Sequence, residues 1–284
     1  MDSFTKHNHF TVHGKSFFSI GGQTHNSSSY IPEDMEVSYA SVQALGGNTI
    51  AVPVPWEMFE PEEGNFNEAF VHQLIDGARN HDLKLIFLWF ATWKNGTMEY
   101  VPSWVKSNRT RFQRALLKDG SPILQLSAHC FKNREADARA FRRLMEIIRE
   151  YDAQEQTVIA VQVENEAGIL GGTKRDFSPL GQKAFEDKVP SVLIQYCQNH
   201  PESLLASKWK KAGALQEGNW KEIFGRYGAE AVTAYAVASY IDYVAAEGKK
   251  AYDIFVYTNV WLDGGSRGMR SNLAGLDWPS GCAG

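Results

Sequence analysis

The chain has 284 residues, of which 43% are hydrophobic and 22% are charged, and this balance excludes disordered and fibrous proteins. With 29 basic and 33 acidic residues the formal charge is −4, which offers no positive field to nucleic acid or to an anionic membrane. No apolar run approaches the roughly 20 residues that span a bilayer. The polar N-terminus lacks the apolar core of a secretory signal, and three scattered cysteines argue against a disulfide framework. We therefore expect a cytoplasmic protein with one domain over residues 1–284.

Apolar strands and helices are predicted to alternate along the chain. Strands are expected over residues 15–22, 48–56, 83–90, 158–163 and 253–261. Helices are expected over residues 32–46, 70–81, 134–151 and 229–248, with two or three more within 179–211 that break near Pro190 and Pro201. A long loop with helical pieces around Val105 is expected between residues 91 and 130. Because the second strand contains two prolines, its end is predicted to be irregular.

The order of these elements indicates a parallel sheet. Its strands are nearly continuous hydrophobic runs, which is typical of parallel strands covered on both faces. A doubly wound sheet and a (β/α)8 TIM barrel both fit this order, but no glycine-rich phosphate-binding motif follows any strand. Each strand instead ends in polar and aromatic residues, which is typical of barrel enzymes. We therefore predict an α/β fold of the (β/α)8 TIM barrel class.

Five predicted strands are fewer than the eight of a closed barrel. A further strand around residues 123–126 would raise the number to six. We therefore expect the chain to be the N-terminal portion of a catalytic barrel, truncated after about five βα units. Such a chain would have open sheet edges and exposed apolar surface.

The strongest chemical signal is the strand end at residues 161–168, which carries Glu164, Asn165 and Glu166. A carboxylic acid at the dry wall of a barrel mouth can serve as a general acid near neutral pH. Glycosidases need two carboxyls that flank the scissile bond. Two side chains from one strand cannot easily flank a sugar, so Glu164 and Glu166 are a poor candidate for this pair. An ion pair with a nearby Arg or Lys is the structural alternative for this segment.

Aromatic residues make up 12% of the chain. A large aromatic core explains them as well as a site that stacks sugar rings does. For the second interpretation the candidate rings are Trp89, Trp93, Trp104 and Trp261.

Motifs at several strand ends resemble those of clan A glycoside hydrolases, in particular β-galactosidases of families 35 and 42. Residues 161–168 are similar to the clan's acid/base motif, in which Asn-Glu ends the fourth strand. Residues 46–67 are similar to the second strand and loop of both families. Residues 21–29 and 88–106 resemble the bacterial family 35 type. The similarity covers most of residues 15–265, with its motifs in the same order.

The resemblance implies a retaining hydrolase of terminal β-galactosides in which Glu166 is the general acid/base and Asn165 binds the sugar 2-hydroxyl. Glu164 is expected to contact a neighbouring polar group. The remaining substrate-binding residues that the resemblance implies are His25, Asn26, Trp56, Glu57, Trp93, Asn95, Asn259 and Trp261. Most of these could equally be packed or capping residues. The clan's nucleophile ends a seventh strand, which is not predicted here, so the isolated chain is expected to be nearly inactive.

A non-catalytic carbohydrate-binding TIM barrel is the main alternative function. A sugar isomerase would need a metal cluster, and His7, His9 and His13 have no carboxylate or cysteine beside them to complete one. We therefore predict no metal and no cofactor, and a carbohydrate as the binding partner. The oligomeric state stays open and could be a homo-oligomer.

Overall fold

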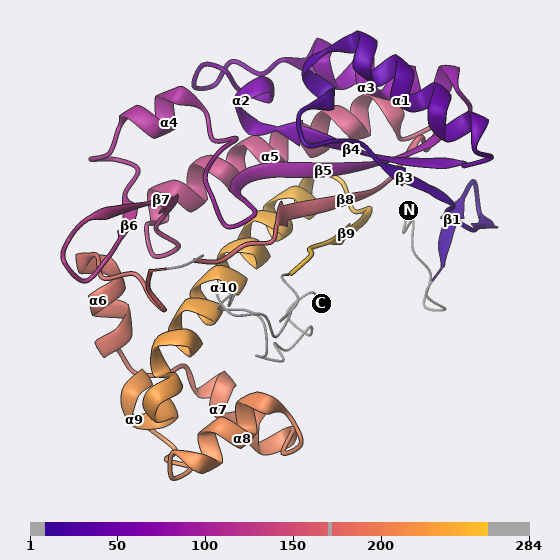
Figure 1. Ribbon diagram of the computed structural model, residues 1–284. Helices are drawn as coiled ribbons and strands as arrows, with labels where there is room; N and C mark the ends of the chain where they lie inside the picture. The colour runs from indigo at the N-terminus through magenta and orange to yellow at the C-terminus, as the bar shows by residue number, and fades with distance from the viewer. Residues whose placement is uncertain (1–8, 170–171, 261–284) are drawn as a thin grey trace.

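A five-stranded parallel sheet organises the protein (Figure 1). The computed structural model describes residues 9–169 and 172–260. The strands follow one another in chain order, each parallel to the next: β3 (Gly21–Gln23), β4 (Thr49–Pro55), β5 (Lys84–Lys94), β8 (Val158–Asn165) and β9 (Phe255–Tyr257). The prediction of five consecutive parallel strands is therefore confirmed.

The central strands are buried because helices cover the sheet. Every position of β8 is buried, as expected for a strand with no polar face. The covering helices are α1 (Pro32–Ala44), α3 (Glu68–Asn80), α5 (Phe131–Asp152) and α10 (Gly228–Ala251). They pack side by side in chain order, α1 on α3, α3 on α5 and α5 on α10. Strand, helix and next strand thus wind in one sense around a shared apolar core.

A glycine sets the distance between α5 and α10. A Cβ atom at Gly248 on α10 would lie 2.2 Å from Cε1 of Phe141 on α5. Because that space belongs to the Phe141 ring, which is fully buried, only a residue without a side chain fits at this point. Gly248 thus allows α10 to pack tightly against α5. The helix predicted over 229–248 covers Gly228–Ala251 in the structure.

The predicted irregular end of the second strand is wrong. β4 pairs with β5 in unbroken register from Thr49 to Pro55, although residues 53 and 55 are prolines. The carbonyl of Ala51 accepts from the Thr24 N–H at 3.0 Å, so residues 51, 53 and 55 face the β3 side of the strand. β3 ends opposite Ala51. At Pro53 and Pro55 the missing N–H group would point to the side beyond the end of β3, where no neighbouring strand needs a donor.

Two predicted strands are shorter than expected. Residues 15–22 form no single strand, because β2 (Lys15–Phe17) pairs antiparallel with β1 (Phe10–Val12) and only β3 joins the sheet. The last strand, expected over 253–261, covers Phe255–Tyr257 among the described residues. A strand does form around residues 123–126. It belongs to a separate antiparallel hairpin of β6 (Arg114–Leu116) and β7 (Pro122–Leu126), so it adds nothing to the parallel sheet.

The helices between residues 179 and 211 agree with the prediction. They are α6 (Pro179–Glu186), α7 (Ser191–Asn199) and α8 (Leu204–Lys211), and the breaks fall near Pro190 and Pro201. The short α9 (Trp220–Phe224) was not predicted; Asn219 and Glu222 form a capping box at its start. The other short helices are α2 (Trp56–Phe59), α4 (Ser103–Ser107), η1 (Ser28–Tyr30) and η2 (Gly225–Tyr227).

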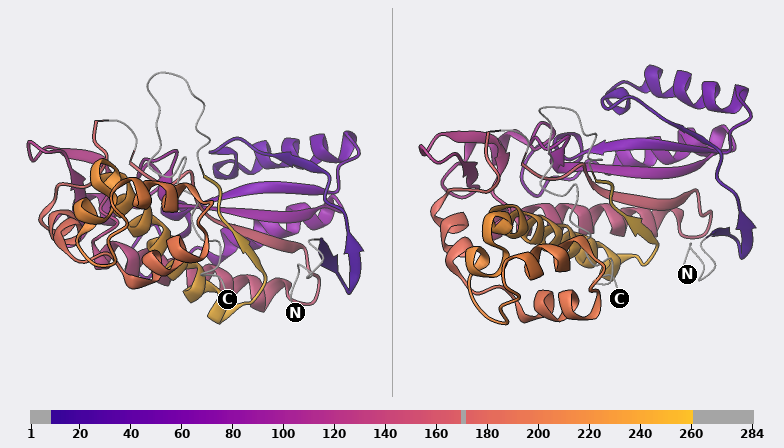
Figure 2. Two further views of the ribbon diagram at one scale, coloured as in Figure 1. Left: turned by 90° about the horizontal axis from the view of Figure 1, so that it is seen from below. Right: turned by 60° about the horizontal axis from the view of Figure 1, so that its bottom comes forward.

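Helices α6 to α9 form a separate unit at the N-terminal end of α10. In both views of Figure 2 they lie at the opposite end of the molecule from α1. They pack on one another and on α10, around a second apolar cluster that includes Trp209, Trp220 and Phe224. No helix in the described part of the chain is both long and apolar enough to cross a membrane.

Gly21 provides a test of the β3–β4 pairing. A Cβ atom there would lie 1.6 Å from the Thr49 carbonyl oxygen, so Gly21→Ala is expected to destabilise this edge by about 1–3 kcal/mol. Hydrogen exchange at the Thr24 amide, which donates to Ala51, reports the loss. Gly22→Ala is the matched control, because its Cβ would meet nothing closer than Val42 Cγ2 at 3.9 Å. Equal exchange in the two variants would contradict the expected clash.

Candidate functional site

Polar side chains at or just after the ends of three strands meet at the carboxyl end of the sheet. Asn165, the last residue of β8, donates from Nδ2 to Oδ1 of Asn95, which follows β5, at 3.2 Å. Its Oδ1 accepts from Nδ2 of Asn259, which follows β9, at 3.1 Å. Asn259 in turn accepts the backbone N–H of Glu166 at 2.8 Å. The structure therefore joins four of the predicted site residues in one hydrogen-bonded network, here called the asparagine network.

The backbone at this network adopts unusual conformations. Asn95, Glu164 and Glu166 have φ angles of 53°, 60° and 49°. A positive φ is uncommon outside glycine and is maintained only where surrounding contacts enforce it. Here Glu164 accepts from the Trp93 N–H on β5, and the Glu166 N–H donates to Asn259 just after β9. Glu166 itself is partly exposed.

Lys94 is a site residue that the sequence interpretation missed. Its side chain is only 6% exposed, donates to Oδ1 of Asn95 at 2.5 Å and lies 4.9 Å from the centre of the Phe90 ring. Burial lowers the pKa of Lys94, and the negative charge of Glu166 acts in the opposite direction. The available signal was position, because Lys94 ends a buried strand directly before Asn95.

Glu164 points to the inside of the protein, as expected, and contacts polar groups. Its carboxyl accepts the backbone N–H groups of Thr92 and Trp93, at 3.2 and 2.7 Å. Its other close neighbour is the carboxyl of Asp137. For Glu164 the alternative of an ion pair with Arg or Lys does not hold, because no basic side chain in the described residues pairs with it. For Glu166 that alternative stays open, since its charge acts on Lys94.

His25, Asn26 and Glu57 lie around the ends of the first two parallel strands. Glu57 accepts from the Tyr30 hydroxyl at 2.6 Å and from Lys106 Nζ at 3.1 Å. Burial, followed by this hydrogen bond, raises the pKa of Tyr30. His25 and Asn26 line an open depression beside Tyr100. His25 is exposed there, whereas Glu57 is already held by two partners of its own chain.

Trp56 and Trp93 belong to the core, which corrects their expected role as sugar-binding rings. Trp56 is fully buried, packs against Trp89 and Trp104, and donates from Nε1 to Glu60 at 2.8 Å. Trp93 is 1% exposed and lies edge-on to the Tyr240 ring, with 4.8 Å between centroids. Neither ring has a face open to a sugar. The predicted Trp261 lies outside the described residues.

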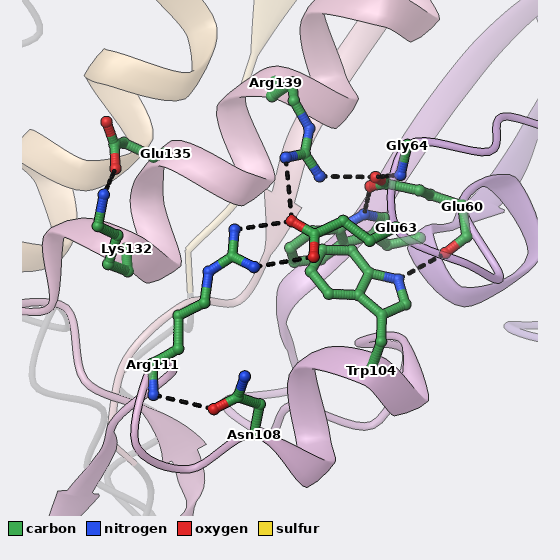
Figure 3. A network of polar contacts seen from close by, with 10 residues as sticks. Glu60, Glu63, Gly64, Trp104, Asn108, Arg111, Lys132, Glu135 and Arg139 are labelled. Atoms are coloured by element: carbon green, nitrogen blue, oxygen red, sulfur yellow. Dashed lines mark hydrogen bonds and ion pairs between the residues drawn. The ribbon is translucent and has the colours of Figure 1, made fainter.

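The motif at residues 46–67 also contains an ion network, which the sequence interpretation did not identify (Figure 3). Glu60, which is fully buried, accepts from Arg139 at 2.6 Å and from the Gly64 N–H at 2.7 Å. Glu63 binds Arg111 through both carboxylate oxygens, at 2.7 and 2.8 Å. The network fastens the loop after β4 to α5 and to the segment before β6. The carboxylate of Glu60, which precedes Pro61 in this motif, therefore stabilises a loop in this chain.

Comparison with known proteins agrees with this architecture. The sequence profile of the family described as "Glycosyl hydrolases family 35" matches residues 9–238. The chain belongs to this family. The resemblance to family 35 is thus confirmed, while family 42 has no specific support.

One human protein is a distant relative of this family 35 chain. The human protein "Beta-galactosidase-1-like protein 3" is 30% identical over 181 residues, which cover 58% of this chain and 24% of that protein. The chain therefore spans about a quarter of the length of this curated relative.

Two solved structures show the same fold. A β-galactosidase from the haloarchaeon Halorubrum lacusprofundi superposes with a TM-score of 0.56 at 18% identity, over 85% of this chain and 36% of that one. A β-galactosidase from Marinomonas ef1 gives 0.53 at 12% identity, over 84% and 37%. The parallel strands and their helices thus have the α/β architecture of a (β/α)8 barrel, as predicted.

Proposed function

We propose that this family 35 protein is a retaining glycoside hydrolase that acts on terminal β-galactosides, with Glu166 as its general acid/base. The main support is the asparagine network, which fixes the backbone of Glu166 at the end of the fourth parallel strand. Catalytic groups of barrel enzymes occupy this end of the strands. Glu166 is a partly exposed residue, and a carboxyl at this position can protonate a glycosidic oxygen and later accept a proton from water.

Asn165 has the orientation of a hydrogen-bond donor. Its carbonyl oxygen already accepts from Gln162 at 3.2 Å and from Asn259 at 3.1 Å. Among the described residues only Asn95 takes a hydrogen from its amide nitrogen. The second amide hydrogen can therefore donate to a sugar hydroxyl, which supports the proposed contact with the 2-hydroxyl.

The proposed reaction is tested with the full-length protein and aryl glycosides. We expect release of nitrophenol from nitrophenyl β-galactoside, with much slower release from the α-anomer. Proton NMR during the first turnovers should show β-galactose before mutarotation, because a retaining mechanism inverts the anomeric carbon twice. α-Galactose as the first product would exclude the proposed mechanism. Binding of galactose without any turnover would favour the alternative of a carbohydrate-binding barrel.

A further inference from the structure

The ladder between β5 and β8 is interrupted next to the asparagine network. The strands pair at Trp89 with Val163 and again at Lys94 with Asn165, so residues 90–93 of β5 lie opposite Glu164 alone. The backbone N–H groups of Thr92 and Trp93 have no ladder partner on β8 in this bulge. Both donate to the Glu164 carboxyl instead, at 3.2 and 2.7 Å. The side chain of Glu164 thus replaces backbone acceptors that the bulge removes.

Asp137 on α5 approaches the same carboxyl from the helix layer. Its Oδ1 accepts from Nε1 of Trp89 at 2.9 Å. Its Oδ2 lies 2.6 Å from the Thr92 hydroxyl and 3.2 Å from the Tyr240 hydroxyl on α10. The carboxyls of Asp137 and Glu164 are hydrogen-bond neighbours, and both residues are 0% exposed. One buried cluster therefore connects β5, β8, α5 and α10.

Two adjacent carboxylates cannot both stay ionised in this environment. In the described part of the chain no Lys, Arg or His pairs with Asp137 or Glu164, and Tyr240 is the titratable group that faces them from α10. Burial first, and the charge of Asp137 second, raise the pKa of Glu164 well above its usual value, against the N–H bonds of Trp93 and Thr92. Tyr240 stays neutral, because burial raises its pKa as well. A proton retained by the carboxyl pair relieves the repulsion.

We propose that Glu164 and Asp137 share one proton and act as positioning residues for the strand end that carries Asn165 and Glu166. The shared proton lets the buried pair close the bulge without a cation. The closed bulge in turn sets Lys94 opposite Asn165, which brings Asn95 into the asparagine network. The positioning of Glu166 for catalysis rests on its proposed function as the acid/base. The shared proton is independent of that function.

Two isosteric variants separate the roles of the two carboxyls. In Asp137→Asn the amide oxygen can still accept from Trp89, the amide nitrogen takes the place of Oδ2 beside hydroxyls that can rotate to accept, and both oxygens of Glu164 still accept from β5. In Glu164→Gln an amide NH₂ must face the N–H of Thr92 or Trp93, which leaves a buried donor unpaired. We therefore expect Asp137→Asn to be the milder change and Glu164→Gln to be the more destabilising one.

Infrared spectroscopy detects the shared proton without any need for activity. The protein at pH 7 is expected to show the C=O stretch of a protonated buried carboxyl, which disappears in Asp137→Asn. Asp152→Asn is the matched control, because Asp152 is also buried but is paired with Arg79 at 2.7 Å, so the band should remain. A band that is missing at pH 7, or that survives in Asp137→Asn, would overturn the proposal.

The pH dependence of unfolding gives a second readout. A folded state that keeps a proton which the unfolded chain releases loses stability as pH rises from the usual glutamate value of 4.5 towards the raised one. The unfolding equilibrium constant should increase up to tenfold per pH unit in this range. In Asp137→Asn the slope should be smaller by one proton, whereas Asp152→Asn should not show this flattening. Identical slopes in all three proteins would contradict a shared proton.

The positioning role is tested in the full-length protein by dependence on the leaving group. If Glu164 positions Glu166, folded Glu164→Gln should lose at least tenfold on a poor leaving group, and less on dinitrophenol, which needs little protonation. Asp137→Asn should show the same trend with a smaller loss. Equal losses on both leaving groups would exclude positioning, while the infrared band would still decide the shared proton. If the wild-type protein hydrolyses no glycoside, the proposed function is wrong. The infrared band then decides by itself whether the carboxyl pair shares a proton.

Discussion

Replacement of Glu166 by Ala in the full-length protein is expected to lower turnover of β-galactosides with alcohol leaving groups by about 10²–10⁴-fold, the usual contribution of a positioned acid. An alcohol leaves slowly unless its oxygen is protonated as the bond breaks. Dinitrophenol leaves as the stable dinitrophenolate anion, so its departure should stay fast in the variant. Stopped-flow measurement of the dinitrophenol burst, followed by the steady-state rate, separates the first step from the second.

Azide tests the second role of Glu166. The variant lacks the base that activates water, so the galactosyl-enzyme should accumulate until a nucleophile that needs no base attacks it. Added azide should restore turnover and give the β-galactosyl azide. Glu99→Ala is the control, because Glu99 is an exposed glutamate close to Lys94 and should show neither effect. Equal loss on both leaving groups without azide rescue would assign Glu166 a structural role, and Glu57 would then be the next carboxyl to test as the acid/base.

Phe141→Ala is expected to produce the largest loss of stability, about 3–5 kcal/mol of unfolding free energy. The ring is fully buried on α5, 5.9 Å from the Trp89 ring between centroids, and it fills the space left by Gly248. Its removal leaves a cavity that the two rigidly packed helices cannot close. Urea unfolding with an unchanged slope in denaturant measures the change.

Phe131→Ala is the matched control for this change. It makes the same substitution on the same helix, but the Phe131 side chain is 50% exposed. We expect a loss below about 1 kcal/mol, since surface substitutions have small effects. If the two variants unfold at the same urea concentration, the α5–α10 contact does not stabilise the fold as inferred.

Much of the fold could be predicted because continuous apolar runs indicate buried strands. Strand β8 is buried at all eight positions, and its sequence alone indicates a strand with no polar face. The outcome at Pro53 and Pro55 could not be predicted in this way. Whether a proline disrupts a strand depends on which side its neighbour occupies and where that neighbour ends, and this is a property of the assembled sheet.

Site residues could be predicted from the sequence where their position at the end of a strand determines where they lie in the structure. Asn165 ends a parallel strand and Asn95 and Asn259 follow two others, and the carboxyl ends of such strands meet at one edge. Trp93 and Asp137 do not follow this rule. Trp93 lies beside a site residue but is buried, and Asp137 lies within a charged amphipathic helix whose buried face includes it. Only the packing of α5 against β5 distinguishes this carboxyl from the solvated ones on the same helix.

Helix α10 has a consequence for how the protein opens. Its first turns, at Val232 and Ala234, pack into the apolar cluster of α6–α9, and its later turns, from Val237 to Val244, pack into the core under the sheet. Units with separate cores commonly exchange amide hydrogen at separate rates. Here the two units share one continuous helix. Unfolding of the smaller unit must therefore remove the packing contacts at the N-terminal end of α10 while the C-terminal end keeps its contacts. The boundary between fast and slow exchange should therefore fall within a single helix, near Tyr235 and Val237, and not in a loop.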